Sequence, residues 1–102
     1  MTVDRFSYRA LFQVDETQPS GLIAMRRWAG PLQAVIWSHS TNRWAYNPRV
    51  AARLIFDDEY EDRRRMVSRE EAERIARERL GAELPSEEVL LQMCQAGAQA
   101  QG

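Results

Sequence analysis

Residues 32–48, LQAVIWSHSTNRWAYNP, contain two short runs of β-branched and aromatic residues on either side of a polar stretch. This pattern is typical of two strands joined by a turn. If residues 39–42 form a four-residue loop, Trp37 lies opposite Trp44 on the neighbouring strand. An aromatic pair of this kind contributes about 0.5–1.5 kcal/mol beyond the area it buries, so we expect it to fix the register of the hairpin.

Two further strands are expected before this hairpin. Residues 5–14 alternate between apolar and polar side chains, which is typical of a half-buried strand. A loop that contains Pro and Gly follows, and residues 22–29 resume the extended pattern. Together with strands at 32–38 and 43–46, they predict an antiparallel meander with one apolar face.

Capping signals predict helices in the second half of the chain. Asn47 and Pro48 are a typical N-cap and first helical residue, so we expect a helix over residues 48–57. Ser68, with a Glu three residues later, forms a capping box and predicts a helix over residues 68–80.

A third helix is expected over residues 86–96, and Gly97 would end it. Residues 98–102 are small and polar, so we expect a disordered tail after a single domain of residues 1–97. Residues 57–67, an acidic block followed by three Arg, fit either a helix or a solvated loop. The predicted fold class is α+β, an antiparallel three- to four-stranded meander followed by two to three helices packed on one face.

Composition limits the classes of function. The 102 residues carry 14 basic and 15 acidic side chains, and every basic residue is Arg. The resulting net charge of -1 gives no global attraction for nucleic acid, so charged recognition must come from local patches. The all-Arg, Ala-rich composition suggests high-GC coding, and we expect a small bacterial protein. Without a signal-peptide pattern or a long apolar stretch, we expect it to be cytoplasmic and without membrane association.

No catalytic motif stands out in the sequence. His39, the only histidine, lies in the predicted turn, and Cys94, the only cysteine, lies on the apolar side of a helix where a thiolate is disfavoured. One His and one Cys cannot form an ordinary zinc set, and the acidic residues 57–62 lack the spacing of a calcium loop. The sequence therefore predicts no metal and no cofactor, and favours a non-catalytic protein over an enzyme.

The predicted binding surface combines Arg with aromatic side chains, the residue types enriched at binding hot spots. We expect an adaptor, inhibitor or self-association module that binds a protein partner or a second copy through the surface around the 32–48 hairpin. The alternative is a nucleic-acid-binding protein, because Arg and exposed aromatics also bind single strands. The predicted binding residues are Arg26, Arg27, Trp28, His39, Arg43, Trp44, Tyr46, Arg63, Arg64 and Arg65.

Overall fold

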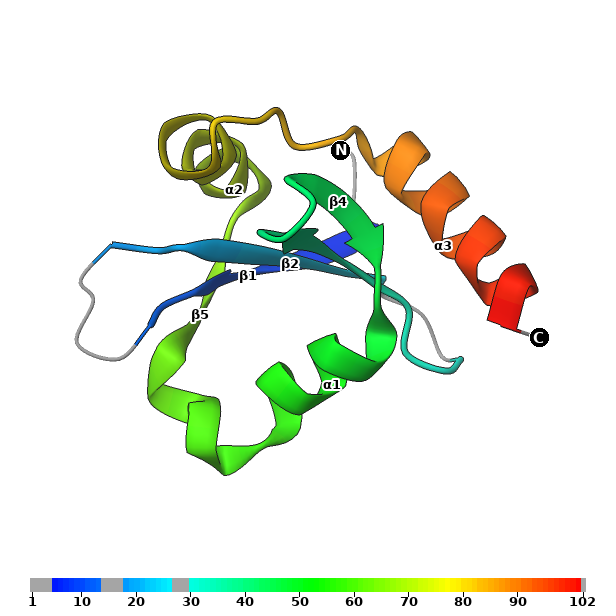
Figure 1. Cartoon of the computed structure of the whole chain (residues 1–102), viewed down its shortest axis with the longest axis horizontal. Helices are drawn as coiled ribbons and strands as arrows, with labels where there is room; N and C mark the ends of the chain where they lie inside the picture. Colours follow the sequence, from blue (N-terminus) through cyan, green and yellow to red (C-terminus); the bar gives the residue numbers. More distant parts are fainter. Residues whose placement is uncertain (1–4, 14–17, 27–29, 102) are drawn as a thin grey trace.

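The computed structural model describes residues 5–13, 18–26 and 30–101 and shows an α+β fold (Figure 1). A five-stranded antiparallel sheet has the order β4-β3-β2-β1-β5, so β4 and β5 form its opposite edges. The strands are β1 (Phe6–Leu11), β2 (Gly21–Arg26), β3 (Ala34–Ser38), β4 (Arg43–Tyr46) and β5 (Arg64–Val67). The helices are α1 (Pro48–Phe56), α2 (Arg69–Ile75) and α3 (Glu87–Gln101), with a 3₁₀ segment η1 (Asp58–Arg63) and a π-helical turn η2 (Ala76–Leu80) that extends α2.

The tryptophan hairpin forms in the predicted register. β3 and β4 pair Trp37 with Trp44 and Val35 with Tyr46. The two indole rings meet edge to face, with centroids 5.1 Å apart and planes at 69°. In the turn between the strands, Asn42 adopts a positive φ of 52°, a conformation that Asn tolerates better than most residues.

The predicted N-caps also form. The side chain of Asn47 accepts the N–H of Val50 at 3.2 Å at the start of α1. The hydroxyl of Ser68 accepts the N–H of Glu71 at 3.1 Å at the start of α2. Gly81 ends η2 in the left-handed conformation, with φ at 65°. These local signals determine helix starts and stops without help from tertiary contacts.

Helices cover both faces of the sheet. α1 lies on one side, where Ala51 and Ile55 pack against Ile23 and Ala34 (Figure 1). α2 and α3 lie on the other side. The prediction that the helix over residues 48–57 shares one face with the later helices is therefore wrong. β2 and β3 carry apolar side chains on both of their faces, so the sheet has a second apolar surface, which α1 shields from water.

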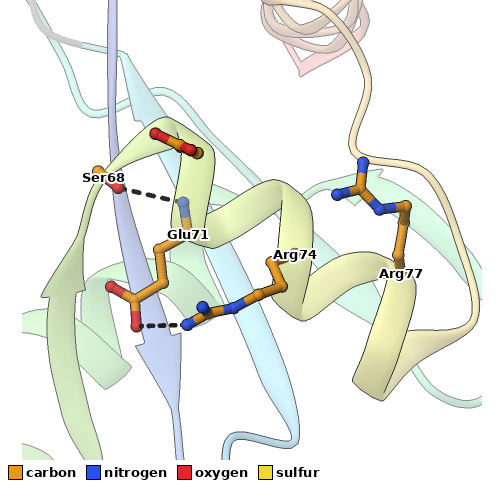
Figure 2. Close-up of a pocket in the computed structure, with 5 residues that line it drawn as sticks. Ser68, Glu71, Arg74 and Arg77 are labelled. Atoms are coloured by element: carbon orange, nitrogen blue, oxygen red, sulfur yellow. Dashed lines mark hydrogen bonds and ion pairs between the residues drawn. The ribbon is translucent and has the colours of Figure 1, made fainter.

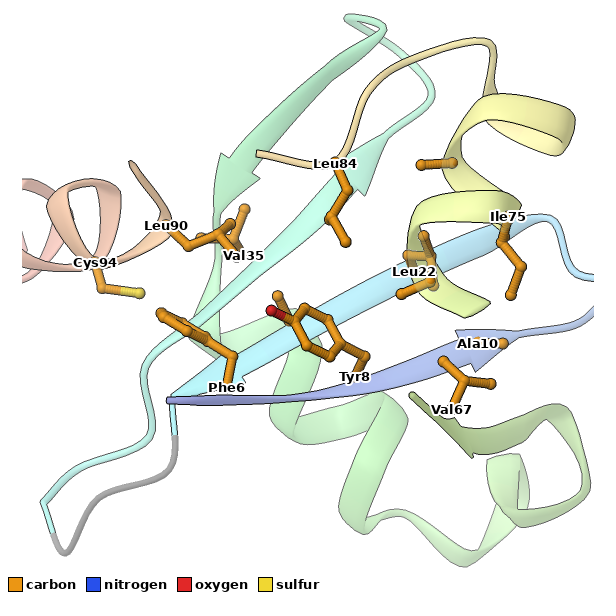
Figure 3. Close-up of a cluster of buried hydrophobic side chains, with 13 residues drawn as sticks. Phe6, Tyr8, Ala10, Leu22, Val35, Val67, Ile75, Leu84, Leu90 and Cys94 are labelled. Atoms are coloured by element: carbon orange, nitrogen blue, oxygen red, sulfur yellow. The ribbon is translucent and has the colours of Figure 1, made fainter. Parts of the chain in front are cut away.

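The larger core lies between the sheet and the pair α2 and α3 (Figure 3). Phe6 and Tyr8 of β1 are almost completely buried there. Ile75 approaches from α2, and Leu90 and Cys94 approach from α3. This cluster fixes the position of β1, which contacts both α2 and the outermost strand β5.

β5 is a strand that the sequence does not predict. The sequence leaves residues 57–67 open between helix and loop, and the structure places η1 and then β5 there. The strand has four residues, two of them Arg, and its partner β1 lies near the start of the chain. A short charged strand paired over such a long sequence separation has no local signal. The sheet consequently has five strands where three or four were expected.

α3 continues through Gly97 to Gln101, beyond the residue where the sequence predicts its end. It therefore includes most of the segment expected to be a disordered tail. Gly97 has a packing role instead, because a Cβ atom added there would fall on the ring of Tyr46. The missing side chain lets α3 approach β4 closely.

Candidate functional site

The aromatic side chains of the predicted hairpin surface are used in packing. Trp37 is only 9% exposed. The indole Nε1–H of Trp44 donates to the carbonyl oxygen of Glu83 at 3.0 Å, which ties the loop before α3 to β4. Tyr46 lies against Gly97, and burial raises the pKa of its phenol. These rings hold the loop and α3 on the sheet, and so present little aromatic surface to a partner.

Two polar residues of the predicted surface lie on the hairpin itself. His39 is exposed in the turn, and its Nε2–H donates to the carbonyl oxygen of Ser20 at 2.7 Å. This bond connects the β3–β4 turn to the segment that leads into β2, a structural role. Arg43 is exposed at the start of β4.

The remaining residues predicted near the hairpin lie on or after β2. The guanidinium of Arg26 donates to the side-chain carbonyl of Gln33 at 2.7 Å. The main-chain N–H of Arg26 also donates to the carbonyl of Gln33, at 2.8 Å, so this Arg serves the start of the β2–β3 ladder. Arg27 and Trp28 lie outside the described residues.

The predicted Arg residues do not gather on one surface. Arg43 belongs to β4, at one edge of the sheet, whereas Arg64 and Arg65 belong to β5, at the opposite edge. Arg63 ends η1, just before β5. Three strands separate the two groups. The structure thus divides the expected Arg and aromatic surface into a packed hairpin and a separate basic edge.

A polar groove of about 350 Å³ runs along α2 (Figure 2). Three of its five lining residues, Ser68, Glu71 and Arg74, already bond one another or a neighbour. The hydroxyl of Ser68 caps the helix, and the carboxylate of Glu71 accepts from Arg65 at 3.0 Å and from Arg74 at 3.5 Å. Exposed pairs of this kind contribute little stability, and they occupy the carboxylate of Glu71 and the guanidinium of Arg74.

The outer edge of β5 presents main-chain groups that β1 does not use. In the β1–β5 ladder, the N–H of Phe12 donates to the carbonyl oxygen of Arg63 at 2.7 Å. Bonded pairs alternate along an antiparallel ladder, so the next β5 residue that bonds to β1 is Arg65. Arg64 and Met66 therefore turn their N–H and C=O groups away from the sheet, toward the edge.

Apolar side chains flank this edge. Met66 is 66% exposed, and Phe56 at the end of α1 is 69% exposed. Arg64 connects the two elements, because its Nη1 donates to the carbonyl oxygens of Leu54 at 2.9 Å and Asp57 at 3.1 Å. These acceptors are neutral, so the bonds orient the guanidinium and leave its positive charge in place.

Arg9 adds a second cation to the same side of the sheet. The register places Arg9 of β1 next to Met66 of β5, with both side chains on the α1 side. The Nη1 of Arg9 is buried and has no hydrogen-bond partner among the described residues. Burial lowers the pKa of Arg9, and the nearby positive charge of Arg64 lowers it further. A buried donor of a cation without a partner costs free energy.

A cleft of about 250 Å³ opens at one end of β5, where β1 continues past the last paired residue. A hydrogen-bond network fixes one wall of this cleft. The hydroxyl of Tyr8 accepts from Nη1 of Arg69 at 2.9 Å and donates to the carboxylate of Glu87 at 2.8 Å. Burial raises the pKa of Tyr8 well above its ordinary value. The cleft is lined by Phe6, Ser7, Tyr8, Met66, Val67, Ser68 and Arg69.

Arg9, Phe56 and Met66 are the residues of this edge that sequence reasoning missed. One signal in the sequence is the Met66-Val67 pair directly after three Arg, an apolar step inside a charged segment. The position of Arg9 next to Met66 depends on the long-range pairing of β1 with β5, and the end of α1, which carries Phe56, is linked to β5 through Arg64. We call Arg9, Phe56, Arg64 and Met66, together with the outward main-chain groups of β5, the β5 edge.

Other kinds of site find less support. Cys94 is completely buried, and burial raises the pKa of its thiol, so it is a poor nucleophile. Among the side chains that the structure describes, which leave out those of residues 58–60, no three His, Cys, Asp or Glu lie together so as to hold a metal ion. None of the helices that the structure describes has the length and apolar character needed to span a bilayer. No protein-family model, curated protein or solved structure matches the chain.

Proposed function

We propose that the protein is a non-catalytic macromolecule-binding module and that the β5 edge is its contact site for a protein partner. The observation that carries this proposal is an edge strand with outward main-chain groups beside two largely exposed apolar side chains, Met66 and Phe56. Addition of a partner strand to an open sheet edge is a general mode of recognition, in which main-chain hydrogen bonds supply much of the affinity.

The stability of the fold does not explain why the large apolar side chains of Phe56 and Met66 are exposed. Edge strands are normally protected by shortness and by charged side chains, and β5 has both features. Large apolar side chains next to such an edge add no stability to the isolated chain. Large apolar and Arg side chains at one place are, however, typical of binding hot spots.

β4, the other edge of the sheet, is a weaker candidate. Trp44 bonds to Glu83, and Tyr46 lies against Gly97 of α3. The outward groups of β4 thus lie next to a loop and a helix that already occupy one side of the strand. The β5 edge has its large apolar side chains exposed, so it is the better site for an added strand.

Nucleic-acid binding, the alternative, has less support. It would require Arg and exposed aromatics on a common surface. The predicted residues Arg43 and Arg64 instead lie at opposite edges, and the hairpin rings Trp37 and Trp44 pack against each other. The β5 edge does combine Arg with the exposed ring of Phe56, but one ring does not provide the series of stacking platforms that a single strand uses. Tight binding of nucleic acid is therefore an outcome that would contradict the proposal.

The test compares the chain with a Met66→Pro variant as bait in a lysate of the source organism. Proline removes the outward N–H of Met66 without removing a bond to β1, so the fold is retained while strand addition is impaired. A Met66→Leu bait is the matched control, because it keeps the N–H and an apolar side chain. We expect a stoichiometric protein partner with the original and Leu baits, and its loss with the Pro bait.

Two results would contradict the proposed function. One is recovery of the same proteins by all three baits, which would place binding elsewhere. The other is strong binding of labelled single- or double-stranded oligonucleotides that weakens steeply between low and moderate salt, which would favour the nucleic-acid alternative.

A further inference from the structure

We infer that the occupant of the β5 edge is an extended acidic segment of a partner protein, with a carboxylate side chain opposite Arg64 and an apolar side chain opposite Met66. This inference rests on the proposed function and adds the chemistry of the partner. It follows from three features of the edge: its charge, its register and the unsuitability of a second copy.

Arg9 and Arg64 lie on the α1 side of β5, and within the described part of the chain neither is in an ion pair. The hydrogen bonds of Arg64 reach two carbonyl oxygens, and the buried Nη1 of Arg9 has no partner among the same residues. The ion pairs that the structure describes involve Arg65, Arg69 and Arg74, on or next to α2 at the other side of the sheet. An incoming carboxylate would therefore meet the guanidinium of Arg64, whose described hydrogen bonds reach only carbonyl oxygens, and Arg binds carboxylates through strong charge-assisted hydrogen bonds.

The register sets where the carboxylate must stand. Arg64 and Met66 lie two residues apart and point to the same side, so the residues of an added strand that face them are also two apart. One of them meets a guanidinium, and the other meets the exposed thioether of Met66. The residue between them faces Arg65, which already pairs with Glu71 and lies over the ring of Phe12. Recognition is thus concentrated in an apolar residue and an acid separated by one position.

A second copy of the chain fits this edge poorly. The outward residues of two antiparallel β5 strands can pair when Arg64 of one copy lies opposite Met66 of the other. That register places Arg65 directly opposite Arg65 of the second copy. Like charges in directly opposed positions destabilise a strand pair. A register with Met66 opposite Met66 avoids this clash, but it places Arg64 opposite residue 68, beyond the end of β5, so an acidic partner is favoured over self-association.

The experiment measures binding of fluorescein-labelled heptapeptides by anisotropy at low salt. The acidic peptide is Ser-Thr-Val-Thr-Glu-Thr-Ser, and its counterparts carry Gln or Lys in place of Glu. We expect the acidic peptide to bind about tenfold more tightly than the Lys peptide, with the Gln peptide between them, because one charge-assisted contact corresponds to about a factor of ten.

Protein variants identify the site. Met66→Pro and Arg64→Gln should each weaken binding of the acidic peptide by about tenfold, through loss of a main-chain donor and of the cation respectively. Met66→Leu and Arg77→Gln are the matched controls, since the first keeps the edge and the second removes an exposed Arg from the groove along α2. Both controls should bind like the original chain, and circular dichroism with thermal melting verifies that every variant is folded.

Equal affinity for the Glu and Lys peptides, or binding that Met66→Pro leaves unchanged, would overturn the inference. A dimer by light scattering that Met66→Pro converts to monomer would also overturn it, because the occupant would then be a second copy. If the bait experiment recovers a partner that the Met66→Pro bait loses, while the peptides show no charge preference, the inference of an acidic segment is wrong but the proposed function stands. If no partner depends on Met66, the proposed function itself fails.

Discussion

Gly97 of α3 lies against the aromatic ring of Tyr46 of β4, so closely that a Cβ atom at position 97 would overlap the ring. This contact positions the carboxyl-terminal half of α3 on the sheet. The contact also explains why Gly, a residue that commonly ends helices, lies inside α3. The close packing of α3 on β4 outweighs the low helix propensity of Gly.

Gly97→Ala should therefore destabilise the protein, although Ala is the better helix former. Overpacking against Tyr46 is expected to lower the free energy of unfolding by about 1–3 kcal/mol. Chemical denaturation monitored by tryptophan fluorescence measures this change. In a Tyr46→Ala background the same substitution should be neutral, or stabilising by up to about 1 kcal/mol, because only the propensity difference remains. Equal destabilisation in both backgrounds would show that the ring is not the cause.

The contact between Trp37 and Trp44 should appear as a coupling energy. Their edge-to-face geometry, with centroids 5.1 Å apart, predicts a coupling of about 0.5–1.5 kcal/mol in a double-mutant cycle with Leu at each position. Trp44→Leu also removes the bond to Glu83, so this substitution should additionally loosen the loop before α3. Strictly additive effects of the two substitutions would contradict an energetic role for the pair.

Tyr8 should make the protein sensitive to alkaline pH. Burial raises its pKa above the ordinary value of 10.0, so the folded state favours the neutral phenol. The corresponding stability is fully present below pH 10 and is lost as the pH rises further. Tyr8→Phe should reduce the fall in the free energy of unfolding between pH 9 and 11.

At pH 7 the same substitution should cost about 1–3 kcal/mol, because it removes the bonds to Arg69 and Glu87. The raised pKa values of Cys94 and Tyr46 leave some alkaline sensitivity in the variant. An identical slope of stability against pH in the original chain and in the Tyr8→Phe variant would disprove the assignment to this phenol.

Proline at neighbouring positions of β5 should lower the free energy of unfolding by very different amounts. The free energy of unfolding of Met66→Pro should remain within about 1 kcal/mol of that of Met66→Ala, because the lost N–H points outward. The free energy of unfolding of Arg65→Pro should be about 3 kcal/mol lower than that of Arg65→Ala, because proline removes a main-chain donor to β1. Urea titrations of the four variants give the two differences, and similar penalties at both positions would mean that the ladder alternates differently.

The parts of the fold that the sequence predicts are those with local signals. The register of the hairpin follows from Trp37 and Trp44 around a short turn, and the starts of α1 and α2 follow from Asn47 and Ser68. The sequence predicts a sheet with a single apolar face, so it does not anticipate that α1 packs on Ile23 and Ala34 while α2 and α3 pack on the other side.

The candidate site depends on information that no short window contains. β5 consists of Arg-rich sequence that becomes a strand only through its pairing with β1. Without β5, Arg9 and Met66 would not lie on a common surface, and Arg64 would not lie at an edge of the sheet. The sequence singles out Arg64, but assigns it to a surface with the hairpin aromatics, whose rings the structure uses in packing.

Amide hydrogen exchange at Met66 and Val67, measured by NMR on the monomeric chain, tests the open β5 edge most directly. The ladder predicts that the N–H of Val67, which bonds to Tyr8 of β1, exchanges slowly, while the N–H of Met66 exchanges at close to the rate of an unprotected amide. Saturation with the acidic peptide should then slow exchange at Met66. Exchange at Met66 as slow as at Val67 in the free monomer would show that the edge is already closed, and the proposed role of this surface would be wrong.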